Sequence, residues 1–253
     1  MAEPPIRPDF ATRLRAVTQA RIALGRAGQA LPTTALLDFQ LAHARARDAV
    51  GAALDTAGFG AAIGGRAVIE VASRATDHAT YLQRPDLGRR LAEADADKLK
   101  AAGDEVAFIV GDGLSATAVQ AHAAALLLAL FDRLPGWRIA PVILARHARV
   151  ALGDEIGALL GVDLVVLLIG ERPGLSAPDS LGAYLTWQPR PGRPDSERNC
   201  ISNIRPPHGL SYARAADSIA WLMTEARSRR LTGVALKDES EVSGSDPGER
   251  RLT

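Results

Sequence analysis

An aliphatic run from Asp163 to Gly170 limits the architectures open to this chain more than any other stretch. Its sequence, DLVVLLIG, has no alternation of polar and apolar residues after the first position. A strand of this kind is covered on both faces, which is typical of a parallel sheet with helices packed on either side. The run therefore predicts a central, buried strand in an α/β domain.

Charged residues and structure-ending residues follow this run directly, as Glu171, Arg172, Pro173 and Gly174. In open α/β sheets, ligands bind outside the carboxyl ends of the strands. A carboxylate at this place is therefore a candidate ligand contact. The simpler interpretation is that Glu171 and Arg172 only pair with each other at the surface.

Strands and helices alternate on both sides of the run from residue 68 onward. The pattern predicts strands at 68–72, 106–110, 139–144 and 199–204, an edge strand at 231–237, helices at 86–103 and 154–160, a long helix from the GDGLS turn to about Leu134, and a last helix capped by Ser211. Residues 171–198 are predicted to be a long connection. Strands separated by helices of this length predict a right-handed, doubly wound and mostly parallel sheet.

The first 65 residues have a different, helical pattern. An irregular arm (1–8) precedes a helix from Asp9 to Ala27, and a second helix runs from Thr34 to about Leu54. The HARAR strip of the second helix is either a solvated face or a surface that docks on a partner chain. We therefore expect three parts: a helical extension (1–65), an α/β domain (66–237) and a disordered polar tail (238–253).

The charge balance argues against nucleic acid and membrane surfaces as partners. The formal net charge is +1, so no global field recruits a polyanion. All but three of the 30 basic residues are arginine, which suits ionic contacts at interfaces, although compositional bias explains this equally well. A single cysteine fits a reducing compartment, and no long apolar span or signal-like start is present. We expect a soluble, intracellular protein.

The segment GDGLSA imitates a dinucleotide-binding fingerprint. Gly111-x-Gly113-x-x-Ala116 follows a predicted strand and opens a helix, where backbone amides could hold a phosphate. The next strand, however, ends in Ala-Arg-His without the required carboxylate, and Asp112 opposes a pyrophosphate. A plain tight turn is the simpler interpretation, and a freestanding nucleotide-binding oxidoreductase remains the alternative.

Other catalytic motifs are incomplete. Cys200 with His208 lacks a legible base contact and oxyanion pocket, and a lone cysteine is more often a small buried apolar residue. The five histidines show no metal-binding spacing, and neither GxSxG nor a P-loop is present. The residues alone therefore predict no catalytic group and no metal site.

Seven long blocks carry a resemblance to one family. They are TQARIALGRAG, LPTTALLDFQLAHARARDAV, ATDHATYLQRPDLGRRL, VAFIVGDGLSATAVQ, RVALGDEIGALL, LIGERPGLSAPDSLGAYLTW and ERNCISNIRPPHGLSY. Through residues 18 to about 237 the chain resembles the small (light) chain of ethanolamine ammonia-lyase. Only the N-terminal arm and the tail lie outside these matches.

The resemblance implies a radical enzyme that converts ethanolamine to acetaldehyde and ammonia with adenosylcobalamin. It implies a large-subunit partner, a (β/α)8 barrel that holds the amine, and a Rossmann-like small subunit that helps enclose the corrinoid between the chains. It further implies an assembly of six large and six small chains, in many bacteria inside a cytoplasmic microcompartment. A pure interaction scaffold that touches no cofactor would also lack catalytic residues.

The resemblance also implies cofactor contacts at individual positions. Val150 in RVALGDEIG, Glu171 in IGERPG and Cys200 in ERNCISN occupy the places of the family's cobalamin-contacting residues. Glu171 could accept hydrogen bonds from corrin amides or a ribose hydroxyl. We further expect Asp112 and Ser115 of the GDGLS turn to help seat the same ligand, and the helices of residues 9–54 to dock on the large subunit.

Overall fold

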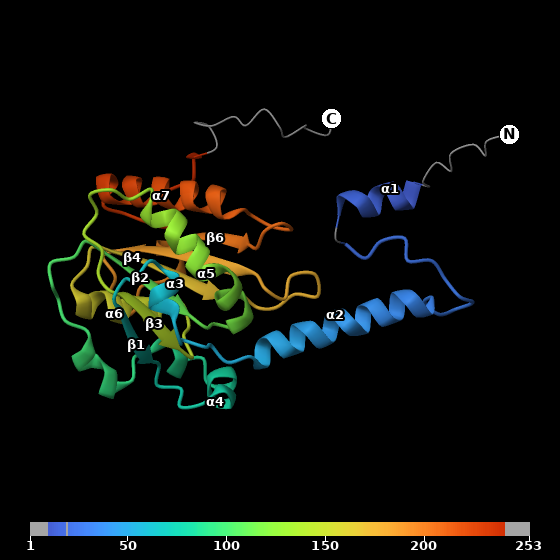
Figure 1. Ribbon diagram of the computed structural model, residues 1–253, viewed down its shortest axis with the longest axis horizontal. Coiled ribbons are helices and arrows are strands. Elements are labelled where there is room, and N and C mark those ends of the chain that lie inside the picture. The colour runs from blue at the N-terminus through green and yellow to red at the C-terminus, as the bar shows by residue number, and fades with distance from the viewer. Residues whose placement is uncertain (1–9, 19, 241–253) are drawn as a thin grey trace.

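The computed structural model, which describes residues 10–18 and 20–240, is built around one six-stranded sheet in the order β1-β3-β2-β4-β5-β6 (Figure 1). The strands are β1 (Val68–Ala72), β2 (Val106–Gly111), β3 (Val142–Arg146), β4 (Leu164–Gly170), β5 (Leu181–Trp187) and β6 (Asn199–Ile204). The first four are mutually parallel, whereas β5 runs antiparallel to both of its neighbours. The predicted α/β, mostly parallel sheet is confirmed.

The central strands are buried along their whole length because helices cover both faces. All residues of β2 and β4 are buried, as the unbroken aliphatic run predicts. Phe108 and Val166 face one apolar cluster, and Ile109 and Leu167 face the other. The two strands end level, with Gly111 of β2 opposite Ile169 of β4, so the residues after them meet at one edge.

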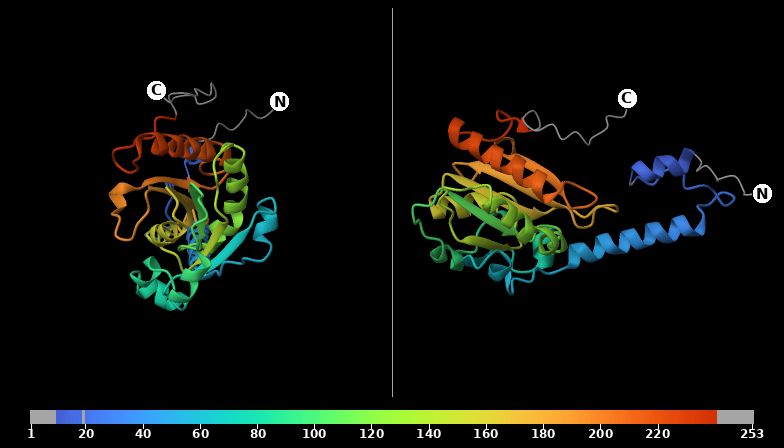
Figure 2. Two further views of the ribbon diagram at one scale, coloured as in Figure 1. Left: turned by 90° about the vertical axis from the view of Figure 1, so that its left-hand side faces the viewer. Right: turned by 45° about the horizontal axis from the view of Figure 1, so that its top comes forward.

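Two helical layers enclose the sheet, and Figure 2 shows them from two further sides. The α-helices are α1 (Phe10–Val17), α2 (Thr33–Gly51), α3 (Phe59–Ala62), α4 (His78–Gln83), α5 (Ala116–Phe131), α6 (Leu152–Leu160) and α7 (Tyr212–Arg229), and the 3-10 turns are η1 (Leu87–Arg89), η2 (Glu93–Lys98) and η3 (Asp195–Glu197). Helices α5 and α7 cover one face and α6 covers the other (Figure 1). This is the doubly wound arrangement.

The N-terminal helices form an arm that leaves the body of the molecule (Figures 1 and 2). Only Ala49, near the base of α2, is buried in that helix. The predicted helix from Asp9 to Ala27 is too long, because α1 ends at Val17. None of the described helices is long and apolar enough to cross a membrane.

Three local predictions need correction. The predicted connection 171–198 contains strand β5. The predicted helix 86–103 is replaced by η1 and η2, because residues 91 and 92 pair with the chain at the end of β1. Segment 231–237 forms no strand; it is held by Asn199, whose side chain binds backbone atoms there. The predicted arm 1–8 and residues 241–253 of the predicted tail lie outside the described residues.

Candidate functional site

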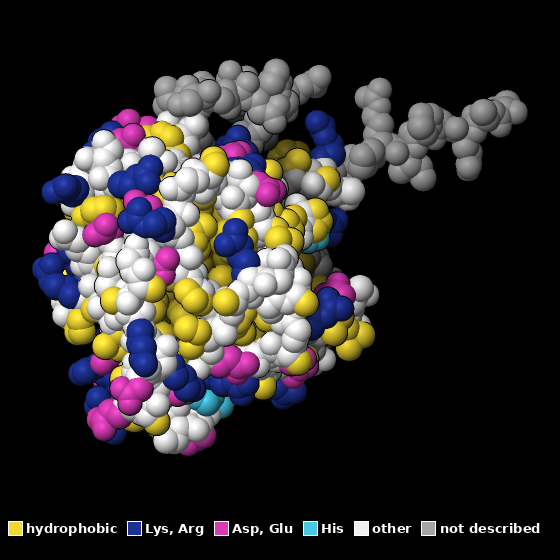
Figure 3. Space-filling view, turned by 60° about the vertical axis from the view of Figure 1, so that its left-hand side comes forward, with side chains coloured by type: hydrophobic (Ala, Val, Ile, Leu, Met, Phe, Trp, Pro, Cys, Tyr) yellow, Lys and Arg dark blue, Asp and Glu magenta, His cyan; other side chains and the backbone are white. Residues whose placement is uncertain are grey.

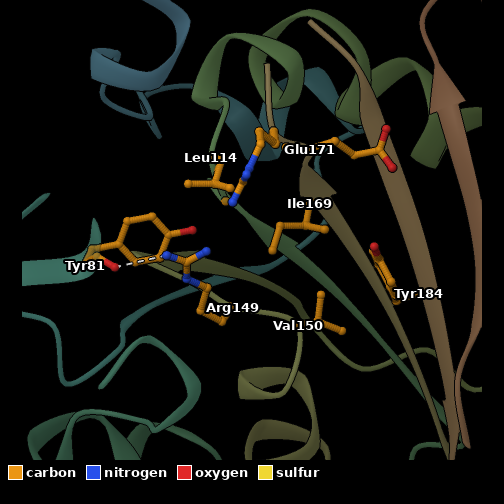
Figure 4. A pocket seen from close by; sticks show the side chains of 10 residues that line it. Tyr81, Leu114, Arg149, Val150, Ile169, Glu171 and Tyr184 are labelled. Carbon is orange, nitrogen blue, oxygen red and sulfur yellow. Dashed lines mark hydrogen bonds between the residues drawn. The ribbon is translucent and has the colours of Figure 1, made fainter. Parts of the chain in front are cut away.

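A cavity of about 400 Å³ lies at the carboxyl edge of the sheet, where β2, β3 and β4 end (Figure 4). It is lined by Tyr81, Gly113, Leu114, Arg149, Val150, Ile169, Gly170, Glu171, Arg172 and Tyr184. This is the edge at which open α/β sheets bind ligands. Most of the lining is apolar or aromatic, and its charged groups are two guanidiniums and one carboxylate.

The floor of the cavity depends on close contact between the GDGLS turn and the end of β4. Gly113 has a φ of +59°, and a side chain there would overlap the carbonyl oxygen of Gly170. A side chain at Gly170 would in turn overlap the backbone of Ser115. Leu114 N donates to Gly170 O at 2.9 Å. The glycines of the fingerprint-like motif are therefore explained by packing within the chain.

Asp112 ties the GDGLS turn to the loop after β3. Its Oδ1 accepts hydrogen bonds from the amides of Gly113 (2.8 Å) and Ala148 (2.9 Å), and its Oδ2 accepts one from the amide of His147 (2.7 Å). Burial raises the pKa of Asp112, although these hydrogen bonds oppose the shift. The carboxylate therefore occupies the Gly113 amide that a pyrophosphate would need, and it does not line the cavity.

Ser115 is a fully buried helix cap rather than part of the cavity wall. Its Oγ accepts a hydrogen bond from Ala118 N (3.2 Å) at the start of α5 and donates one to Pro178 O (2.9 Å). Pro178 belongs to the connection between β4 and β5. Ser115 therefore holds the segment that begins with Glu171 against α5.

Glu171 lines the cavity with its stem, and its carboxylate is turned toward β6 (Figure 4). The carboxylate accepts hydrogen bonds from the hydroxyl of Ser180, from Ser202 Oγ (2.6 Å) and from Asn203 N (3.2 Å). A side chain at Gly182 would meet the Glu171 side chain at 2.9 to 3.2 Å. No ion pair joins Glu171 to Arg172 in the described part of the chain, so the simple surface pair is wrong.

Arg149 is held rigidly on the opposite side of the cavity. Its guanidinium lies 4.3 Å from the ring centroid of Tyr81, and its Nη2 donates to Tyr81 O at 3.1 Å (Figure 4). Its main-chain amide donates to Gly88 O at 2.9 Å. A side chain at Gly88 would come within 2.8 Å of Arg149 Cγ, so a glycine leaves room for the arginine stem.

Val150 and Cys200 are both related to Tyr184, the first through the cavity and the second through the sheet. Val150 lines the cavity directly, as does Tyr184 of β5. Cys200 of β6 is opposite Tyr184 in the antiparallel pair and is exposed. Partial withdrawal of the thiol from water raises the pKa of Cys200, and the nearby Glu171 charge adds to this, whereas the Tyr184 hydroxyl lowers it.

The predicted contacts thus fall into two groups. Val150 and Glu171 line one cavity, with Cys200 next to its Tyr184 wall. Asp112 and Ser115 lie behind the cavity and bind the segments that form it. Sequence reasoning missed Tyr81, Arg149, Leu114, Ile169 and Tyr184. Arg149 adjoins Val150 in the chain, which was a usable signal, whereas only folding brings Tyr81 to this edge.

Two features of the described residues bear on which groups the surface could bind. The described residues contain no group of three or more His, Cys, Asp or Glu side chains that could hold a metal ion. On the face shown in Figure 3, acidic and basic side chains are interspersed around a band of hydrophobic ones. That face has no extended charge of one sign.

Comparison with known proteins gives one consistent result. Residues 8–237 match the family model described as "Ethanolamine ammonia-lyase light chain (EutC)". Proteins named "Ethanolamine ammonia-lyase small subunit" are 54% identical in Azotobacter vinelandii (93% of each chain covered), 52% in Bradyrhizobium diazoefficiens (100% of this chain and 98% of the relative) and 55% in Rhodopseudomonas palustris (92% and 91%). The chain belongs to the ethanolamine ammonia-lyase light-chain, or small-subunit, family.

Proposed function

We propose that this chain is the small subunit of an adenosylcobalamin-dependent ethanolamine ammonia-lyase, a carbon–nitrogen lyase that forms acetaldehyde and ammonia. A light chain implies a large-subunit partner. In this proposal the small chain encloses one side of the cobalamin, and the large chain binds the amine and covers the other side. The cofactor supplies the radical chemistry, while the protein positions and shields it.

The observation that carries the proposal is the clustering of the three family-matched positions. Val150 follows β3, Glu171 follows β4 and Cys200 lies in β6, far apart in the sequence. In the fold, Val150 and Glu171 line one cavity, and Cys200 is paired with its wall residue Tyr184. A ligand at this edge could contact all three.

The chemistry of the cavity fits part of a corrinoid. Leu114, Val150 and Ile169 offer apolar surface, and Tyr81 and Tyr184 offer aromatic surface. The buried Nε of Arg149 has no hydrogen-bond partner in the described chain, so a donor is available for a ligand acceptor. A cavity of about 400 Å³ encloses only part of so large a cofactor, which agrees with a site completed by a second chain.

Asp112 and Ser115 have an indirect role in this proposal. Asp112 fixes the loop that carries Arg149 and Val150 through the amides of residues 147 and 148. Ser115 fixes the connection that carries Glu171 through Pro178 O. Both are positioning residues that keep the walls of the cavity at their correct separation.

The division of the chain supports the same assembly. We infer that residues 1–65 form the extension that docks on the large subunit, and that residues 66–237 form the cobalamin-binding domain. Eight large apolar side chains are exposed in the described part of the extension: Phe10, Leu14, Val17, Leu31, Leu36, Leu37, Phe39 and Leu41. We further propose six large and six small chains, located in the cytoplasm within a bacterial microcompartment.

Coexpression with a cognate large chain tests the activity. The purified two-chain complex is expected to release acetaldehyde from ethanolamine only when adenosylcobalamin is added. Glu171→Ala in that complex is expected to weaken cobalamin binding, and Asp217→Ala, an exposed change on α7, serves as the control. Wild-type affinity in Glu171→Ala would remove Glu171 from the site. A complex without cobalamin-dependent acetaldehyde release would refute the proposed function.

Two other functions make different predictions. A nucleotide-binding oxidoreductase requires saturable nicotinamide binding, which the occupied Gly113 amide argues against. If the chain is only a scaffold that does not contact the cofactor, adding cobalamin to the complex should not change the rate at which this chain is cleaved by a protease. Protection by cobalamin supports the cofactor site instead.

A further inference from the structure

Two guanidiniums face a cavity that offers them no anion. Arg149 and Arg172 both line it, and its single carboxylate, Glu171, is occupied by two hydroxyls and one amide. Arg172 makes no hydrogen bond or ion pair within the described residues. The side chains that line the cavity therefore carry an excess of positive charge.

Arg149 has an unused donor that is already fixed in direction. Its Nε is buried and has no hydrogen-bond partner in the described chain, a state that costs free energy unless a ligand supplies an acceptor. Stacking on Tyr81 and the bond from Nη2 to Tyr81 O hold the plane of the guanidinium. A planar, preorganised fork of this kind suits a phosphate with two oxygens available.

The neighbouring backbone adds little to this attraction. Gly113 and Leu114 line the cavity just before helix α5, but their amides already donate to Asp112 Oδ1 and Gly170 O. The Asp112 carboxylate also offsets the partial positive charge of the helix N-terminus. The attraction for an anion therefore rests on the two arginines.

We propose that Arg149, assisted by Arg172, binds the anionic phosphodiester that joins the corrin ring of cobalamin to its nucleotide. This assignment rests on the proposed cobalamin site and adds to it the part of the cofactor that this chain recognises. It places the nucleotide loop of the cofactor on the small subunit. Glu171, whose carboxylate already accepts three hydrogen bonds, then has about one acceptor position left for an uncharged group of the ligand.

Binding of three corrinoids distinguishes the contribution of the phosphate from that of the rest of the cofactor. Cyanocobalamin carries the phosphodiester, cobinamide lacks the phosphate and nucleotide, and cobinamide phosphate restores the phosphate alone. Their dissociation constants are measured by absorbance titration of the purified two-chain complex. The control for Arg149→Met is Arg66→Met. Arg66 is also stacked on a ring, with its guanidinium 3.9 Å from the Phe131 centroid, but it precedes β1 at the opposite edge of the sheet.

Arg149→Met is expected to weaken cyanocobalamin and cobinamide phosphate about tenfold or more and to leave cobinamide unchanged. Arg66→Met is expected to change none of the three. Equal losses for all three corrinoids, or no loss for any, would overturn the phosphate assignment. If Arg149→Met does not assemble, Arg172→Met, which has no hydrogen bond or ion pair to lose within the described chain, decides by the same pattern. A wild-type complex that binds none of the corrinoids would instead contradict the proposed function.

Discussion

Arg198 holds Asp154 through two hydrogen bonds in the interior, from Nη1 to Oδ1 at 2.6 Å and from Nη2 to Oδ2 at 2.7 Å. The side chains are only 2% and 1% exposed. The same guanidinium donates to Thr186 Oγ1 (3.0 Å) and Arg193 O (2.9 Å). It therefore fastens the first turn of α6, which follows the loop carrying Val150, to the antiparallel half of the sheet.

Arg198→Met is expected to lower the free energy of unfolding by about 3–5 kcal/mol, because it leaves the Asp154 carboxylate buried without its counter-ion. Urea unfolding followed by circular dichroism measures this. Combining it with Asp154→Leu should recover most of the loss. Arg84→Met, which breaks an exposed two-bond pair with Asp86, is the control and should leave stability nearly unchanged. Equal effects of both single substitutions would contradict the structural role of the buried pair.

Ser115→Ala is expected to cost about 1–2 kcal/mol of stability through the lost cap of α5 and also to weaken cobalamin binding. The second effect follows because the hydroxyl no longer holds Pro178 and the connection that begins with Glu171. Ser211→Ala is the matched control, because Ser211 caps α7 and its hydroxyl accepts a hydrogen bond from Arg214 N. Thermal unfolding and cobalamin titration of the complex should separate the two variants. A similar loss of affinity in both would assign the effect to general destabilisation.

The strand pattern was predictable where burial left a continuous apolar signal. β2 and β4 are buried throughout and were found from their aliphatic runs. β5 was missed because its seven residues lie in a Pro-, Gly- and Ser-rich stretch. The predicted helix 86–103 failed because pairing of residues 91 and 92 with the end of β1 outweighed local helical preference. The strand predicted at 231–237 is absent because this segment forms hydrogen bonds with the side chain of Asn199 instead of with a neighbouring strand.

The site was predictable only in part. The edge of the sheet followed from the position of Glu171 after a buried strand, and Val150 and Cys200 came from the family resemblance. Arg149 and Tyr81 could not be paired from the sequence, because they are 68 residues apart in the chain and only the fold stacks them. Asp112 and Ser115 lie behind the cavity rather than in its wall, because their side chains bind backbone groups that only the fold brings near them.

Cys200 allows a direct chemical test because it is the only cysteine. Its pKa is raised by desolvation and by Glu171, so less thiolate is present near pH 7.5 and alkylation by iodoacetamide should be severalfold slower than for a free cysteine peptide. Glu171→Gln removes one cause and should speed the reaction, whereas Tyr184→Phe removes an opposing contact and should slow it. Mass spectrometry of timed samples measures the rates. An unchanged rate in both variants would contradict the described contacts.

The arm makes a prediction about assembly. Leu37 and Leu41 are 57% and 51% exposed on α2, and changing both to glutamate should prevent copurification with the large chain while the α/β domain stays folded. Deleting residues 9–54 should have the same effect. Leu128→Glu, at a side chain 43% exposed on α5, is the control. Pull-down with a tagged large chain measures binding. Normal copurification after the deletion would refute the docking role.

The position of cobalt in the assembled enzyme tests the central claim most directly. Crystals of the two-chain complex with adenosylcobalamin, measured at the cobalt absorption edge, give that position from an anomalous difference map. We predict a cobalt peak facing the carboxyl edge of the sheet, with the corrinoid in contact with Val150, Glu171 and Cys200. A peak at another surface of this chain, with the cavity beside Arg149 and Tyr184 free of cofactor, would contradict the account.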